Sequence, residues 1–203
     1  MARPSNTDQR RAQIVDALLS VMARTGYERA TIVAVADAAG LGQGLIHYHF
    51  ANKQEILVAL VERLSLGLEA RVGERLARAG DDPKRRVHAL VDAYVARGKD
   101  ADARAVSAWV LVGAEAVRLD EVRVLYERAL SRSLERLRSE VADYLRAEGR
   151  IARNAPKIAA AMLSAIEGSY QIAVGAPGLL PEGFAAPTLR KMVDGLVLAE
   201  ERS

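Results

Sequence analysis

Apolar residues recur three and four positions apart along nearly the whole chain, from Thr7 onward. This spacing places them on one face of successive α-helices. No stretch alternates apolar and polar residues between hairpin turn signals, so the pattern does not favour β-strands. The fold is therefore predicted to be all-α.

The first predicted helix covers residues 7–25 and ends at Gly26, because glycine readily adopts the left-handed conformation of a helix cap. Its apolar face holds Ile14, Leu18, Val21 and Met22. A short second helix opens at Thr31, whose hydroxyl can cap the amides that follow, and it ends at Gly40. Its apolar face holds Ile32, Val35, Ala36 and Ala39.

A third, short helix is predicted from about Gly42 to Tyr48, and Asn52 offers the N-cap of a long helix over residues 53–78. Residues 1–53 are thus predicted to form an N-terminal three-helix domain, and residues 54–203 a C-terminal helical bundle. The further helices of this bundle are predicted at residues 83–97, 101–118, 120–148, 155–174 and 187–202.

The second and third helices, joined by about four residues that include glycine and preceded by a bracing helix, satisfy the requirements of a helix-turn-helix over residues 31–50. At about 100° per residue, one arc of the third helix holds Gln43, Gly44, His47 and Tyr48, with Ile46 on the opposite side. Glutamine can pair bidentately with adenine, while histidine and tyrosine can donate to phosphate. Taken alone this pattern is weak, because polar residues on one face of a short helix are more often simply solvated.

Composition neither requires nor excludes a nucleic acid partner. The chain has 29 lysines and arginines against 26 acidic residues, a formal charge of +3. A DNA-binding face needs only a few well-placed phosphate contacts. The absence of cysteine excludes disulfides, thiolate zinc sites and cysteine nucleophiles, and it fits a cytoplasmic location. No run approaches the roughly 18 apolar residues of a membrane helix, so no membrane partner is expected.

The prediction of a helix-turn-helix becomes much stronger when residues 31–57 are read as a whole, TIVAVADAAGLGQGLIHYHFANKQEIL. It resembles the signature of the TetR (tetracycline repressor) family, from Gly26-Tyr27 through Phe50 and into the following helix. Two departures concern the recognition helix: Gly42 stands where a serine usually caps it, and His47 and His49 stand where tyrosines are usual. Replacing a serine cap by glycine costs only a few tenths of a kcal/mol, so the departures bear on the operator sequence more than on DNA binding.

The resemblance implies roles for individual residues of the motif. Thr31 matches a phosphate contact at the start of the second helix, and Gly42 lies at the cap of the recognition helix. The positions that read bases are matched by Gln43, Gly44, Leu45 and His47, and those that clamp phosphates by Tyr48 and Lys53. Leu45 either packs inward or contacts a thymine methyl, whereas His49 is expected to pack in the core.

Other constellations give no support to catalysis or to a metal site, and no cofactor is expected. His47 and His49 lie about 200° apart on a helix and His88 stands alone in another helix, so no metal ligands converge. The sequence contains no glycine-rich phosphate loop, no nucleophile elbow and no favourably spaced pair of carboxylates. The protein is therefore not expected to be an enzyme.

The helix at residues 101–118 is apolar nearly all round, with Val106, Trp109, Val110, Leu111, Val112 and Val117, which predicts a place in the core. Glu115 interrupts it. Because a buried carboxylate needs a partner, Glu115 is expected to pair with an arginine or, less favoured, to meet a polar or cationic ligand. The residues predicted to line an effector cavity are Tyr94, Trp109, Glu115, Met162, Tyr170 and Gln171.

The last two helices carry small and apolar faces, which fit either the core of the chain or contact with a second copy. The family resemblance implies the second reading, in which these helices pair with their symmetry mates in a four-helix interface. The residues predicted to form it are Ala161, Ala165, Gly168, Leu189, Met192, Val193 and Leu196.

These features together predict a ligand-responsive transcriptional regulator, a homodimeric repressor that binds a palindromic operator in double-stranded DNA and responds to a small-molecule effector. An alternative is an architectural or activating DNA-binding protein that is regulated by a protein partner. A third hypothesis, a helical enzyme that retains the motif as scaffold, is distinguished by failure to bind DNA.

Overall fold

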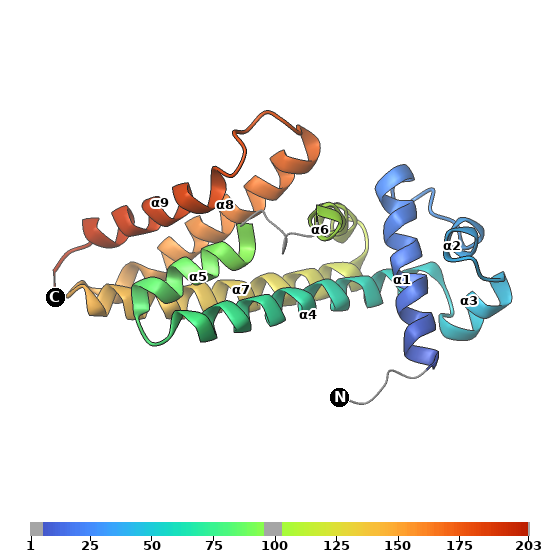
Figure 1. Ribbon diagram of the computed structural model, residues 1–203, viewed down its shortest axis with the longest axis horizontal. Coiled ribbons are helices and arrows are strands. Elements are labelled where there is room, and N and C mark those ends of the chain that lie inside the picture. The colour runs from blue at the N-terminus through green and yellow to red at the C-terminus, as the bar shows by residue number, and fades with distance from the viewer. Residues whose placement is uncertain (1–5, 96–102, 203) are drawn as a thin grey trace. The chain divides into compact units, whose positions relative to one another are not determined.

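The computed structural model describes residues 6–95 and 103–202, and over these residues the regular structure is helical (Figure 1). The described part of the chain contains no β-strand beyond one isolated bridge between Arg150 and Arg202. The all-α prediction is therefore confirmed.

The helices follow one another much as the periodicity predicts. Their bounds are α1 Asn6–Thr25, α2 Ile32–Ala39, α3 Gln43–His49, α4 Lys53–Ala79, α5 Pro83–Val95, α6 Ala103–Ala116, α7 Asp120–Ala147, a 3-10 turn η1 Ala152–Asn154, α8 Ala155–Gly175 and α9 Ala185–Ala199. The last helix begins two residues earlier and ends three residues earlier than predicted. The predicted ends at residues 96–97 and 101–102 lie outside the described residues.

The chain packs as two compact units, one of residues 1–65 with 102–127 and one of residues 66–101 with 128–203. This division differs from the predicted boundary after residue 53. The reason is that the first turns of α4 are part of the N-terminal core, where Ile56, Leu57 and Leu60 are fully buried. Helix α6 also belongs to this core through Ala108 and Val112.

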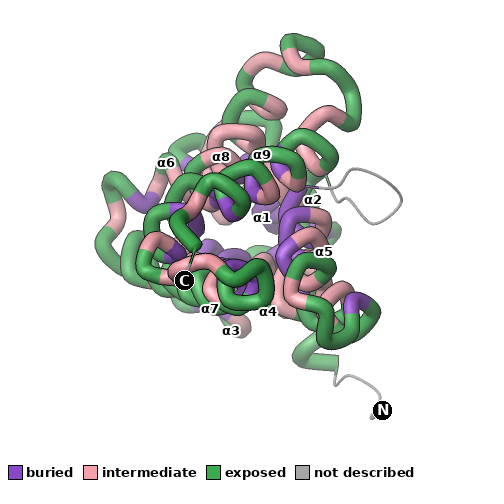
Figure 2. Tube along the Cα trace, turned by 90° about the vertical axis from the view of Figure 1, so that its left-hand side faces the viewer, coloured by how far each residue is buried: buried purple, intermediate pink, exposed green. Residues whose placement is uncertain are grey.

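Helix α1 provides the centre of the first unit and packs against α2, α3 and α6. Its side chains Ile14 and Leu18 are fully buried, together with Val35 of α2 and Ile46 of α3. Figure 2 shows the buried segments in purple, with exposed backbone on the outer faces. The prediction that α6 lies in the core is confirmed, although only one of its faces packs inward and Val117, just beyond its end, is 86% exposed.

The second unit is built on α5, α8 and α9, which pack against one another and share their core with α7. The buried residues include Leu90 of α5, Tyr144 of α7, Ile166 of α8 and Val193 of α9.

One segment of the second unit, Ala152–Gly175, is long and apolar enough to cross a membrane by length and composition alone. This corrects the expectation that no such run exists. One such helix is weak evidence for a membrane span, because the core helix of a soluble protein passes the same test. Of the apolar window in this segment, 22% is buried inside the chain, and Ile158, Met162 and Ile166 of the segment lie in the core of the second unit.

Candidate nucleic-acid interface

The ends of α2 are fixed by the two residues that the sequence singles out. Thr31 has extended backbone, and its hydroxyl oxygen accepts a hydrogen bond from the Ala34 amide at 3.1 Å. Gly40 adopts a left-handed conformation with φ of 63°, and its amide donates to the carbonyls of Ala36 and Asp37. A side chain at this position would be strained, so glycine sets the turn that leads to α3. Both predicted caps are confirmed.

Helix α3 presents the predicted polar arc to solvent. Gln43, Gly44, His47 and Tyr48 are exposed, while Ile46 is fully buried on the opposite side. Leu45 is 36% exposed, so it lies at the edge of the outer face. As expected, Gly42 caps α3 without a side-chain hydrogen bond.

His49 is only partly buried and meets the ring of Tyr48 edge-on, with 5.0 Å between the ring centroids. The expectation that it packs in the core is therefore not met. Phe50, the next residue, is the one that enters the core.

Helix α1 supplies side-chain donors to the last carbonyls of both helices of the motif. Gln13 Nε2 donates to the Ala39 carbonyl at 2.7 Å, and Arg10 Nη1 holds the Gln13 amide oxygen at 2.8 Å. Arg11 Nη1 donates to the His49 carbonyl at 2.5 Å. These carbonyls have no partner within their own helices, so α1 fixes where α2 and α3 end. Sequence reasoning missed this role, because no local pattern shows which distant carbonyl a side chain meets.

Lys53, predicted to clamp a phosphate, makes contacts within the first unit. Its ammonium donates to the carbonyls of Tyr27 at 2.8 Å and Glu28 at 3.3 Å, and it lies 4.1 Å from the centroid of the Tyr27 ring. Desolvation by burial lowers the pKa of Lys53, and the negative charges of Glu28 and Glu115 oppose this effect. Lys53 therefore ties the start of α4 to the loop between α1 and α2.

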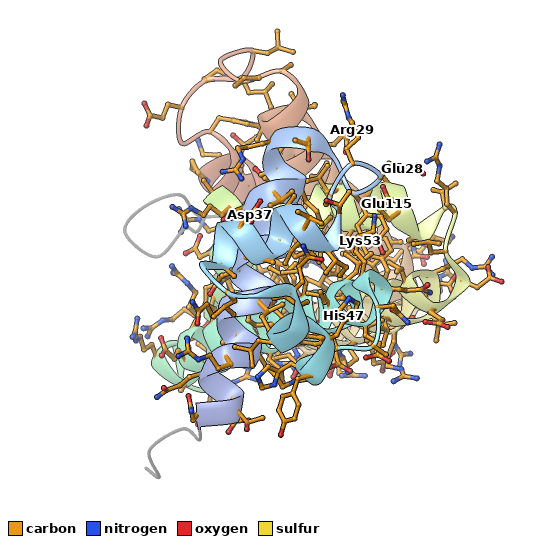
Figure 3. The ribbon with its side chains drawn as sticks, turned by 90° about the vertical axis from the view of Figure 1, so that its right-hand side faces the viewer. Glu28, Arg29, Asp37, His47, Lys53 and Glu115 are labelled. Atoms are coloured by element: carbon orange, nitrogen blue, oxygen red, sulfur yellow. The ribbon has the colours of Figure 1, made fainter. Side chains whose placement is uncertain are left out.

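Glu115 of α6 acts on the same loop, and Figure 3 shows Glu115 beside Lys53 and Glu28. Burial, followed by the charge of Glu115, raises the pKa of Tyr27 to about 12. Among the described residues no arginine forms an ion pair with Glu115, so the favoured expectation for this residue was wrong. Arg118, which follows α6, instead pairs with Glu28 at 2.8 Å.

The residues predicted to line an effector cavity fall in both units. Trp109 and Glu115 belong to the first unit, where the Trp109 ring lies 4.7 Å from that of Tyr126. Tyr94, Met162 and Tyr170 share the core of the second unit, whereas Gln171 is exposed. Helical periodicity could not assign the set, because it does not show which helices pack together.

Tyr94 and Tyr170 are directly linked, since the Tyr170 hydroxyl donates to the Tyr94 carbonyl at 2.6 Å. Burial and then the charge of Glu167 raise the pKa of Tyr170. Burial raises the pKa of Tyr94 as well, against a hydrogen bond with Ser133 that lowers it. The second unit thus contains two neutral phenols close to the carboxylate of Glu167.

The predicted interface residues divide between two faces of α8 and α9. Leu189 and Val193 are buried in the chain's own core, so their assignment to an outer interface was wrong. Met192 and Leu196 are 51% and 41% exposed. The stripe divides because α9 packs through Leu189, Val193 and Val197, which leaves the neighbouring positions outside. On α8, Ala161 is exposed, and Ala165 and Gly168 are partly exposed.

Comparisons with known proteins agree with this arrangement. Residues 14–60 match the family described as bacterial regulatory proteins, tetR family, and residues 83–198 match the C-terminal domain described as BetI-type transcriptional repressor. The HTH-type transcriptional regulator BetI of Rhizobium meliloti (strain 1021) is 32% identical over 197 residues, 92% of each chain. The chain belongs to the TetR family of bacterial regulatory proteins. It is a DNA-binding transcriptional regulator, as the helix-turn-helix predicts.

Solved structures of other regulators share the fold. A transcriptional regulator from Rhodococcus sp. Rha1 has a TM-score of 0.80 at 22% identity, covering 95% of this chain and 98% of that one. A transcriptional regulator from Saccharomonospora viridis, solved in complex with choline, has a TM-score of 0.73 at 22% identity and covers 96% and 99% of the two chains. This likeness of fold extends over both units.

Proposed function

We propose that this TetR-family regulator is a homodimeric repressor that binds a palindromic operator and releases it when a small molecule binds in the C-terminal unit. The observation that carries the proposal is the exposed polar arc of α3, held in place by the caps from α1. In a dimer two such helices enter successive major grooves, roughly 34–36 Å apart. A change in that spacing then weakens binding.

The chemistry of the arc supports reading of bases by Gln43 and contacts to the DNA backbone around it. Gln43 carries a donor and an acceptor that can match adenine N6 and N7. Gly44, beside it, has no side chain, and no neighbouring atom lies close to the place that a Cβ would take. The backbone can therefore approach the groove closely. The Thr31 oxygen is used by the helix cap, but its proton remains available to a phosphate. Tyr48, 78% exposed, can donate likewise.

The proposed dimer face is the outer flank of α9 together with α8. At about 100° per residue, Met192 and Leu196 lie on the flank of α9 opposite to Arg190 and Asp194. Those two polar residues bind α5, through Asp92 and His88. Because α9 packs on both α5 and α8, Met192 and Leu196 lie on the α8 side. There we expect them to continue the small-residue surface of Ala161, Ala165 and Gly168.

The proposed effector is a small organic cation, for which choline is the first probe. The regulator from Saccharomonospora viridis was solved with choline. In this chain Tyr94 and Tyr170 lie in the same core, and Glu167 is close enough to affect the pKa values of both phenols. Aromatic faces near a carboxylate are the surroundings that quaternary ammonium groups favour.

The test is fluorescence anisotropy of labelled DNA from upstream of the protein's own gene, titrated with the protein and then with choline. The control ligand is 3,3-dimethylbutanol, which has the shape of choline without its charge. Saturable release by choline and not by the neutral alcohol supports the cationic effector. If only other metabolites release the DNA, the effector is not an organic cation, but the protein is still a ligand-responsive repressor. If no small molecule releases the DNA, the alternative is favoured, in which this chain is an activating or architectural DNA-binding protein that is regulated by a protein partner.

A further inference from the structure

The second unit carries a surface pocket of about 270 Å³ at the hairpin that joins α4 to α5. Helix α4 contributes Arg75, Arg78 and Ala79, which are three and four positions apart and so share one face. Helix α5 contributes residues 85, 88, 89 and 92, which share a face for the same reason. None of these residues belongs to the proposed DNA-binding, dimer or effector surfaces.

The hollow arises from the alternation of long and small side chains on the two faces. Ala79 and Ala89 lack the length to fill the space between the helices, while arginines line it. The hairpin is closed by Gly80, with φ of 70°, and by Asp82, whose carboxylate accepts the Arg85 amide at 2.8 Å. The shape of the pocket is therefore set by short-range structure.

Positive charge dominates this pocket. Its guanidinium groups come from Arg75, Arg78 and Arg85, and its one carboxylate, Asp92, is bound by Arg190 of α9 at 3.0 Å. Arg78 contacts Glu74 only at 3.4 Å, and both of these side chains are more than two-thirds exposed, so this ion pair is weak. The other acidic residues at the hairpin are Asp81 and Asp82.

His88 adds a ring that is already oriented. Its Nε2 lies 2.8 Å from the Asp194 carboxylate, which also binds Lys84 at 3.1 Å and the Tyr144 hydroxyl at 3.1 Å. This cluster holds the ring at the pocket wall through one nitrogen, so the guanidinium groups rather than His88 supply the positive charge for a ligand.

We propose that this pocket binds a small anion that carries at least two negative charges on clustered oxygens. Guanidinium groups form paired, charge-assisted hydrogen bonds with phosphate and carboxylate oxygens. The volume, below the range of about 300–1,000 Å³ for drug-sized ligands, favours a small anion. Phosphates and di- or tricarboxylates share this chemistry. The site is separate from the proposed effector site, and it needs neither DNA nor effector.

The test is isothermal titration of the purified full chain at constant ionic strength, with inorganic pyrophosphate, citrate and acetate as probes. We expect saturable binding of pyrophosphate or citrate, whichever matches the site, and none of acetate. Arg85→Glu and the milder Arg85→Gln should each weaken binding by about tenfold or more, because each removes charged hydrogen bonds. Arg128→Glu, the same charge reversal on an exposed residue of α7 in this unit, is the matched control and should bind as the wild type does.

Saturable binding that is lost in both Arg85 variants and kept in Arg128→Glu establishes the site, and the preferred probe shows whether phosphate or carboxylate is its ligand. The proposal is overturned if neither pyrophosphate nor citrate saturates. It is also overturned if the Arg85 and Arg128 variants lose affinity equally, which indicates only general attraction to a basic protein. Circular dichroism of each variant shows that the fold is intact.

Discussion

The guanidinium carbon of Arg11 lies 4.0 Å from the centroid of the Phe50 ring, while its Nη1 donates to the carbonyl of His49. One side chain of α1 thus holds both the last carbonyl of the recognition helix and the aromatic residue that anchors its end in the core. The orientation of α3 depends on α1 through this contact.

Replacing Arg11 should therefore weaken operator binding without removing a base contact. We expect Arg11→Ala to lower operator affinity by about tenfold, the effect of losing a charged hydrogen bond to a helix end. Arg11→Lys should restore little, because lysine keeps the charge but lacks the planar group that stacks on Phe50. Anisotropy titrations measure both, and Arg24→Ala, an exposed arginine on the same helix, is the control. Full rescue by lysine would instead identify a simple phosphate contact.

A substitution of Lys53 distinguishes two roles for this residue, a structural contact with the loop between α1 and α2 and a contact with a DNA phosphate. Because its ammonium is bound to the loop carbonyls, we expect Lys53→Ala to reduce the free energy of unfolding by about 1–2 kcal/mol. The dependence of log K on log salt should stay the same. A clamp would reduce that slope by about one per contact, hence about two per dimer. Urea unfolding and titrations at several salt concentrations distinguish the two roles.

Gln43 is expected to read sequence. Gln43→Ala should cost roughly 1–3 kcal/mol on the natural operator and relax the preference at one base pair of each half-site. Competition against operator variants measures this preference. An equal loss on every variant would show that the exposed arc of α3 does not read that base. Val33→Ala, at an exposed position of α2, serves as the comparison.

The outer flank of α9 provides the test of the dimer. Leu196→Arg combined with Ala165→Arg should produce monomers that bind operator poorly, since each change places an arginine in an apolar contact. Leu198→Arg is the control, because Leu198 is also exposed on α9 but lies about 160° from Leu196 around the helix. Analytical ultracentrifugation gives the mass of each. A folded, unchanged dimer in the double variant would rule out this face.

Asp194 should stabilise the second unit in a pH-dependent manner. Burial, the largest influence, would raise the pKa of Asp194, but hydrogen bonds from His88, Lys84 and Tyr144 outweigh it and lower the pKa. The folded state thus favours the ionised carboxylate, so the stabilisation is present above the unfolded pKa of about 4 and is lost as pH falls through the lower folded value.

Asp194→Asn should consequently lower the free energy of unfolding by about 1–2 kcal/mol near neutral pH. Its difference from the wild type should shrink below about pH 4. Chemical denaturation across this range measures both effects. Asp143→Asn removes an exposed ion pair with Arg146 and should change little. A difference between wild type and Asp194→Asn that persists in acid would mean that shape, rather than charge, accounts for the effect.

The sequence by itself determined the helices, the caps and the exposed polar face of α3, because these depend on residues within about one turn of each other. Thr31, Gly40 and Asn52 act as the pattern predicts: the Asn52 carboxamide oxygen accepts the Glu55 amide at 2.9 Å. The resemblance of residues 31–57 to the TetR-family signature then allowed the function to be predicted as well.

Only the tertiary structure decided which side chains from distant segments meet. The contact of Arg11 with His49 spans 38 residues and that of Lys53 with Tyr27 spans 26. The apolar stripe of α9 divided into an inner and an outer face for the same reason. Periodicity identifies an apolar face but not the partner that covers it, because that partner depends on how all the helices pack to bury their apolar surface together.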